Sequence, residues 1–423
     1  MRITDTSIIS DFLSSINRSK SRTNRLNAQL ANNQNILKVS DDPTVASAIL
    51  RVNEDLDRVK QYQNNVTNGK TLLKATADGL GEVSDLIGEV NNLLTGAETS
   101  GDAALLGQLA AQVEEKLAAA KDIGNQWFDR KYIFGGTQTT TVPFVRTGNP
   151  SQWSYQGNAG AIQYQVGDGV SQIVNVSGAA AFESSGYLDL TGVLSRTAAV
   201  NTVVSQTLQI TDAAGSVHNV TMNMTKTKSN TWEISAAMPP GATDANLTGG
   251  TATVTFDPVS GAMKEIVRGT ALVLSPTGAT PAQTPPPVSM LFTANGLTEG
   301  TPAGGPTVAG TQRNVSLFNK MLEISNNLRS GKRPSTDDMS MLSTMRDVVM
   351  REEARAGAYS ENLTTAGNFL TAQETHLQDV LESKQAPNIA EIGVRLKQEQ
   401  TMLDAALSAA ANLIPKSLVD FLK

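Results

Sequence analysis

The sequence predicts a mainly α-helical chain with an all-β region inserted into it. Two long segments carry apolar residues at alternating steps of three and four, the spacing of helices that pack along a coiled-coil seam. Between them, residues 145–310 are rich in Gly, Thr, Ser, Asn and Pro and contain short alternating strand patterns, which predict one or two antiparallel β modules. We therefore expect the two helical segments to pair as a long antiparallel coiled-coil rod, with one or two outer β domains at its far end.

The first rod helix is expected to run from Asp42 to about Leu94. Ser40, Asp41 and Asp42 offer N-capping oxygens, and Pro43 suits the first helical position because an N–H there would lack a helical partner. At 1.5 Å per residue such a helix would be about 75 Å long. The predicted seam residues are Val45, Ile49, Val52, Leu56, Leu80 and Ile87.

A second rod helix is expected over residues 336–384, with Thr336, Asp337 and Asp338 as its cap and only Glu352 and Gln373 interrupting the apolar register. Since the β region lies between the two helices, antiparallel pairing follows. Residues 42–144 and 311–384 are thus predicted to form one helical rod domain. The seam residues on this side are Leu342, Val349, Leu363, Leu370 and Leu377.

The two ends of the chain, residues 1–41 and 385–423, carry a thinner apolar pattern with many polar interruptions. Helices of this kind are marginal alone in water, because most helix stability comes from packing. We expect both ends to be disordered in the monomer and to fold against each other when copies assemble. The predicted assembly interface comprises Phe12, Ile16, Leu26, Leu30, Leu396, Leu403, Leu413, Leu418 and Phe421.

Composition excludes several classes of protein. The chain has no cysteine, which rules out disulfides, thiol catalysis and thiolate metal sites. A net charge of −6 argues against nucleic acid as a partner, and the basic face of Arg18, Lys20, Arg22 and Arg25 is better read as a solvated helix face. No apolar stretch is long enough for a membrane span, and the first residues lack the apolar core of a secretory signal.

We find no pattern that predicts catalysis, a metal or a cofactor. The two histidines, His218 and His376, are far apart in sequence and lie outside any metal-binding spacing. Asp41 and Asp42 are adjacent carboxylates, but capping is the better explanation for them. The glycine pair Gly135-Gly136 lacks the spacing of a phosphate loop. The sequence therefore predicts a structural protein and no enzyme.

Several motifs in the helical parts carry a resemblance to a known family. They are Met1-Arg2-Ile3-Thr4, Ser40-Asp41-Asp42-Pro43, Asn125 with Lys131-Tyr132-Ile133-Phe134-Gly135-Gly136-Thr137, Pro143-Phe144, Arg355-Ala356-Gly357-Ala358 and Ser417-Leu418-Val419-Asp420-Phe421-Leu422. Through these motifs the helical parts resemble the flagellin superfamily and, within it, the hook–filament junction proteins of the hook-associated protein 3 family. Segments of the β region, such as Thr225-Lys226-Thr227 and Val254-Thr255-Phe256-Asp257, resemble an outer β domain of the flagellar hook protein.

The resemblance implies a subunit of the bacterial flagellum, outside the cell, exported by the flagellar type III apparatus. It would form a ring of copies between the first hook-associated junction protein and flagellin, and act as a mechanical adaptor. A cytoplasmic export chaperone would hold residues 389–422 before export. Departures from the family pattern, such as Asn32-Asn33-Gln34-Asn35 before the Asp-Asp-Pro motif and Pro415 in the last helical stretch, concern the packing of the ends.

Two other functions stay open. A filament flagellin is the nearest alternative, although the Tyr132 to Thr137 motif favours a junction protein. A binding module in the β region, such as an adhesin carried on the flagellum, has less support because that region lacks aromatic clusters.

Overall fold

The computed structural model describes residues 5–97, 102–148, 152–183, 185–212, 216–277, 287–302 and 305–413. Within helices and strands, the side chains of residues 5–9, 12, 295 and 409–413 also lie outside this description. The chain divides into two compact units. Unit 1 comprises Met1–Asn64 and Asn368–Lys423, and unit 2 comprises Asn65–Gly367. Both division points fall inside long helices, whereas the sequence places domain boundaries near residues 41 and 385.

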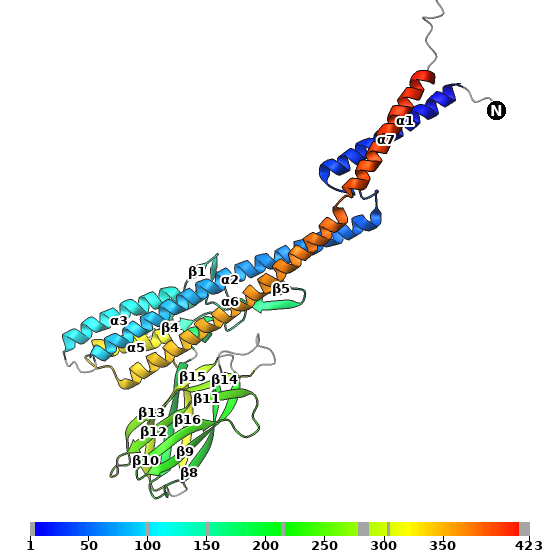
Figure 1. Cartoon of the computed structure of the whole chain (residues 1–423). Coiled ribbons are helices and arrows are strands. Elements are labelled where there is room, and N and C mark those ends of the chain that lie inside the picture. The colour runs from blue at the N-terminus through cyan, green and yellow to red at the C-terminus, as the bar shows by residue number, and fades with distance from the viewer. Residues whose placement is uncertain are drawn as a thin grey trace, which may run out of the picture. The chain divides into compact units, whose positions relative to one another are not determined.

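Seven helices are present in the described residues. Two of them are very long, α2 with 55 residues and α6 with 50, as their apolar periodicity predicts. The helices are α1 (Asp5–Asn32), α2 (Pro43–Ala97), α3 (Ala103–Gly124), α4 (Gly178–Phe182), α5 (Leu317–Arg329), α6 (Thr336–Gln385) and α7 (Ile389–Leu413) (Figure 1).

Local capping sets where the long helices begin. The Asp42 carboxylate accepts hydrogen bonds from the backbone N–H groups of Thr44 and Val45, both at 3.0 Å, so Asp42 is the N-cap of α2. At the start of α6, Ser335 Oγ accepts from Asp338 N at 3.1 Å and Asp338 Oδ2 accepts from Ser335 N at 2.9 Å. This reciprocal capping box makes Ser335 the cap residue, one position before the predicted cap.

In unit 2, α2 and α6 run antiparallel (Figure 1). Arg346 Nε of α6 donates to Ser84 Oγ of α2 at 3.2 Å, and Met339 Sδ of α6 lies 3.8 Å from Thr95 Oγ1 of α2. A later residue of α2 therefore meets an earlier residue of α6. The helix α3 packs on α5, where Ser325 Oγ donates to Glu114 Oε1 at 2.8 Å. The antiparallel helical pairing agrees with the sequence, and its coiled-coil character stays a prediction.

The inserted region holds one β-sandwich, formed by residues 185–314. One sheet has the order β13-β12-β10-β9-β8 and the other the order β11-β14-β15-β7-β16. Its strands are β7 (Ser185–Ser195), β8 (Val203–Thr211), β9 (Val217–Lys228), β10 (Thr231–Ala237), β11 (Ala245–Thr248), β12 (Thr251–Phe256), β13 (Met263–Arg268), β14 (Leu272–Pro276), β15 (Val288–Gly300) and β16 (Thr307–Asn314).

The sandwich forms because alternate residues of its strands are apolar. In β9, Val220, Met222 and Met224 are buried, while the residues between them face outward. They pack with Trp232, Phe256 and residues of the second sheet in one continuous core.

The structure corrects three expectations for this region. The strands are not all antiparallel, because β15 pairs with β7 in parallel. The region is not purely β, because it contains the one-turn helix α4. Residues 311–314, expected in the rod, continue strand β16, and the helix begins only at Leu317.

Residues 127–173 form three small antiparallel hairpins. Their strands are β1 (Trp127–Phe128), β2 (Lys131–Tyr132), β3 (Phe144–Thr147), β4 (Gln152–Tyr155), β5 (Gln163–Gly167) and β6 (Val170–Ile173). Among the described helices, none is both long and apolar enough to cross a lipid bilayer.

Candidate assembly surface and motif cluster

The terminal helices α1 and α7 pack against each other as an antiparallel pair within unit 1. Ser19 Oγ donates to Glu399 Oε2 at 2.8 Å, and Arg22 Nε donates to Glu399 Oε1 at 2.7 Å. Further along, Asn35 N donates to Gln385 O at 2.8 Å. The two ends therefore find partners inside one chain, so contacts between copies are not their only source of packing.

Glu399 is the polar centre of this pair. Its hydrogen bond with Arg22, followed by that with Ser19, holds the pKa of the Glu399 carboxyl below its ordinary value. Because the Arg22 side chain is 53% exposed, this ion pair contributes little to the stability of the helix pair.

The predicted assembly residues have mixed positions. Ile16, Leu26, Leu30, Leu396 and Leu403 are all half-buried on α1 and α7. Phe12 and Leu413 belong to these helices, but their side chains lie outside the described part, as do Leu418 and Phe421 altogether. The role of this set in assembly stays a prediction.

The predicted seam residues differ between the units. In unit 2, Leu80, Ile87, Leu342, Val349 and Leu363 are completely buried. In unit 1, Leu56 and Leu370 are buried, but the remaining members are only half-buried, namely Val45, Ile49, Val52 and Leu377. The apolar face is therefore covered in unit 2 and partly open in unit 1.

Unit 1 also exposes large apolar side chains. Val394 is 59% exposed and Met402 is 52% exposed, although both lie on a helix that already has a partner. The other exposed large apolar residues described in unit 1 are Leu13, Val39, Leu50, Phe369, Ile389 and Leu407. Large contiguous apolar patches are typical of interaction sites, so these residues are candidates for an assembly surface.

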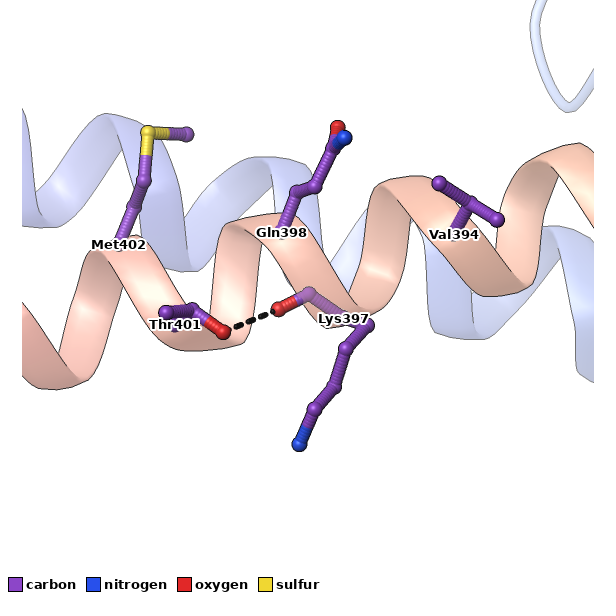
Figure 2. A pocket seen from close by; sticks show the side chains of 5 residues that line it. All are labelled: Val394, Lys397, Gln398, Thr401 and Met402. Atoms are coloured by element: carbon purple, nitrogen blue, oxygen red, sulfur yellow. Dashed lines mark hydrogen bonds between the residues drawn. The ribbon is translucent and has the colours of Figure 1, made fainter.

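One open groove of about 530 Å³ lies on α7 and is lined by Val394, Lys397, Gln398, Thr401 and Met402. Figure 2 shows Val394, Gln398 and Met402 pointing to the same side of the helix, as their spacing of four residues requires. Val394 and Met402 were absent from the predicted interface. The sequence signal that could have identified them is that Val394 and Met402 lie on one face of the helix, offset from the face of Leu396 and Leu403.

The Phe134 to Thr137 motif forms a tight turn that requires glycine. Gly136 has a φ of +66°, and a Cβ there would lie 2.0 Å from Asn158 O. The Asn158 side chain in turn accepts from the backbone N–H of Thr137 at 2.9 Å. A side chain at position 136 would therefore clash with the segment that the motif binds.

An aromatic cluster joins this motif to the helices. Phe144 packs against Phe318 of α5 with ring centroids 4.6 Å apart, and Phe182 of α4 contacts Phe134 at 5.2 Å. Asn125 positions Phe144, because its side chain accepts from Phe144 N at 2.8 Å and donates to Phe144 O at 2.9 Å. The motif residues thus connect the turn to α4 and α5 by side-chain packing.

Among the described residues, no group of three or more His, Cys, Asp or Glu side chains is arranged to hold a metal ion. His376 is exposed on α6, whereas His218 is buried in the sandwich between two carboxylates. The sequence did not indicate this environment of His218.

Residues 194–341 match the family described as flagellar basal body protein FlaE D2 domain. The match extends from Leu194 in β7 to Met341 in α6 and so covers most of the sandwich. It confirms the predicted likeness of this region to a flagellar β domain. A search of curated protein sequences finds no match to the chain.

Solved structures similar to this chain include flagellar proteins. Flagellar hook associated protein-3 from Legionella pneumophila shares 16% identity, with 79% of this chain and 98% of that chain covered and a TM-score of 0.48. FlgL from Xanthomonas campestris also shares 16% identity, with coverage of 78% and 99% and a TM-score of 0.37. FliC from Burkholderia pseudomallei shares 15%, with coverage of 74% and 99% and a TM-score of 0.25.

Proposed function

We propose that this chain is a structural subunit of the bacterial flagellum at the hook–filament junction. It joins the hook-side junction protein to the flagellin filament and acts as a mechanical adaptor rather than an enzyme. The observation that carries the proposal is the flagellar domain at residues 194–341, inserted into helical segments with a junction-type motif at Tyr132 to Thr137. The proposed location is outside the cell, after export by the flagellar type III apparatus.

The exposed apolar residues of unit 1 support assembly with neighbours. In the proposal, the α1 and α7 surfaces pack against other copies in a ring, against the hook-side junction protein and against flagellin. Before export, a cytoplasmic chaperone covers residues 389–422. Burial of apolar surface supplies about 25 cal/mol per Å², so a few such side chains on each copy stabilise a ring substantially.

Deletion of the gene in its own host tests the proposed place in the flagellum. The mutant should keep its hooks, release flagellin into the medium and lack filaments, and the intact gene should restore filaments. Electron microscopy and analysis of the culture medium provide the measurements. Normal filaments in the mutant would contradict the proposal.

The same strain separates the alternatives. If the chain were the filament flagellin, the medium of the deletion mutant would lack the main filament protein. If it were an adhesin, filaments would stay intact and only attachment to surfaces would be lost.

The assembly surface is tested by Val394→Glu and Met402→Glu. Each change places a charge on the exposed face of α7, so ring assembly should fail while the monomer keeps its helical content. Leu105→Glu, on an exposed position of α3 in unit 2, is the matched control and should leave assembly intact. Filament counts in complemented strains and circular dichroism of the purified variants measure the two effects. Normal filament numbers with both α7 variants would contradict this role of α7.

A further inference from the structure

His218 occupies an unusual environment at one end of the β-sandwich. It is the second residue of β9, and its side chain is only 6% exposed. Its Nε2 lies 3.1 Å from Asp212 Oδ2, and its Nδ1 lies 2.7 Å from Asp244 Oδ2. Both ring nitrogens therefore face carboxylate oxygens at hydrogen-bond distance.

This geometry favours the charged ring. A neutral imidazole has one N–H donor and one lone pair, so one of its nitrogens would point a lone pair at a carboxylate. The imidazolium donates from both nitrogens and pairs its charge with both acids. Asp212 needs such a cation most, because its side chain is only 1% exposed, whereas that of Asp244 is 51% exposed and open to water.

The three residues connect segments from both sheets. Asp212 closes the β8–β9 turn, since its backbone N–H donates to Ser216 O and its Oδ1 accepts from Ser216 N, both at 2.9 Å. Asp244 lies just before β11 of the second sheet, and its carbonyl accepts from Thr277 N at the end of β14 at 2.9 Å. The ring of His218 thus links the end of one sheet to the end of the other.

We propose that His218 is a pH-sensitive tie that, as an imidazolium, holds the β10–β11 connection to the β8–β9 turn. When the ring loses its proton to solvent, the remaining N–H stays on buried Asp212, because that carboxylate has no comparable access to water. Asp244 then loses its donor and becomes hydrated, and the β10–β11 connection is released from this end of the sandwich.

The electrostatics agree with this geometry. Burial by itself lowers the pKa of His218, but hydrogen bonds to Asp212 and Asp244 outweigh burial and raise it above its ordinary value of 6.5. The same contact lowers the pKa of Asp244. A raised histidine pKa means that the stabilisation is complete below the unfolded-state pKa and is lost as the pH rises through the folded-state pKa. At low pH, protonation of Asp244 removes the same stabilisation.

Nuclear magnetic resonance of the imidazole Cε1–H groups tests the proposal on the full-length chain. Because the chain has only two histidines, His376→Gln assigns both signals. The His218 signal should titrate at a higher pH in the folded chain than in the urea-unfolded chain. Asp244→Asn should lower that titration midpoint, and it keeps the test usable because this exposed residue can change without loss of the fold.

Amide hydrogen exchange supplies the second measurement. Protection of residues 242–248 should fall as the pH passes the His218 midpoint, beyond the change in intrinsic exchange rate. His218→Gln should show low protection at every pH, and His376→Gln should match the wild type. A buried histidine with a purely structural role would titrate at or below its unfolded value, or leave protection of residues 242–248 unchanged across its titration; either result overturns the proposal.

Discussion

At the scale of single residues, the burial of Glu183 changes the pKa of its carboxyl. It follows the last residue of α4, and its backbone N–H donates to Ala179 O at 3.2 Å. Burial raises the pKa of its carboxyl from 4.5 to about 7. The neutral acid is therefore the form that the fold prefers, and its ionisation near neutral pH costs stability.

We expect Glu183→Gln to remove this cost. In the wild type, the favourable contribution of the neutral acid is complete below pH 4.5 and is lost as the pH rises through about 7. At pH 8, the variant should gain up to about 3 kcal/mol in free energy of unfolding, while at pH 4 the two chains should differ little. Urea unfolding at both pH values measures this.

The control is Glu265→Gln, at an exposed position of β13, which should change the free energy of unfolding equally at both pH values. An equal pH response of Glu183→Gln and the wild type would contradict the assignment. All of the compared chains retain His218, so its own titration contributes equally to each of them.

At the scale of elements, a buried ion pair links the two sheets of the sandwich. Lys226 of β9 lies 3.2 Å from the Glu299 carboxylate of β15, and these side chains are 4% and 0% exposed. Trp232 of β10 donates its indole N–H to the same carboxylate at 3.0 Å. Because both charges are buried, each depends on the other to offset the cost of leaving water.

Lys226→Met should destabilise the sandwich by about 3–5 kcal/mol, because it leaves the Glu299 charge buried without a cation. The double variant Lys226→Met/Glu299→Met should recover part of this loss, since it removes the unpaired charge but leaves the Trp232 indole N–H without its acceptor. Denaturant unfolding followed by tryptophan fluorescence provides the measurement.

Lys74→Met is the matched control, because its pair with Asp78 is largely exposed, at 76% and 64%. It should cost less than about 0.5 kcal/mol. Similar losses in free energy of unfolding at positions 74 and 226 would show that burial does not determine how much an ion pair contributes to stability.

At the scale of the whole molecule, the sandwich is an insertion whose two ends are adjacent. Val315 N donates to Ser185 O at 2.9 Å, and Gly186 pairs with Asn314 where β7 meets β16. Among the described residues, two arginines make polar contacts between the sandwich and α6: Arg268 Nη2 lies 3.1 Å from Asp337 Oδ2, and Arg351 Nη2 lies 3.4 Å from Ser289 Oγ. Domains joined in this way tolerate excision because the chain can be closed by a short linker.

Replacement of residues 187–313 by a short Gly-Ser linker should leave a folded helical protein. The α3–α5 packing and the aromatic cluster around Phe144 lie outside the excised residues, so their contacts remain. Circular dichroism should show a helical chain with cooperative thermal unfolding. A similar linker that replaces residues 130–160 removes the Gly136 turn and Phe144 and should abolish cooperative unfolding. If both deletion variants lose cooperative unfolding, the helical part depends on the sandwich, and the sandwich is not an independent insertion.

The sequence by itself determined the long helices and the kinds of element between them. Heptad spacing and the Asp42-Pro43 start are local features, so the predicted 42–94 and 336–384 lie within a few residues of α2 and α6. The motif from Phe134 to Thr137 was identified in the sequence through its resemblance to a family, and the structure adds the reason for its glycine, the positive φ and the close approach at Gly136.

Only the tertiary structure decided which residues meet across long sequence separations. The parallel pairing of β7 with β15, the exposure of Val394 and Met402, and the two carboxylates around His218 all depend on segments brought together by folding. Burial and pKa are set by what lies next to a side chain in space, and no periodicity in the sequence records that neighbour. The helix α4 was not predicted because a single turn is too short to show a helical periodicity in the sequence.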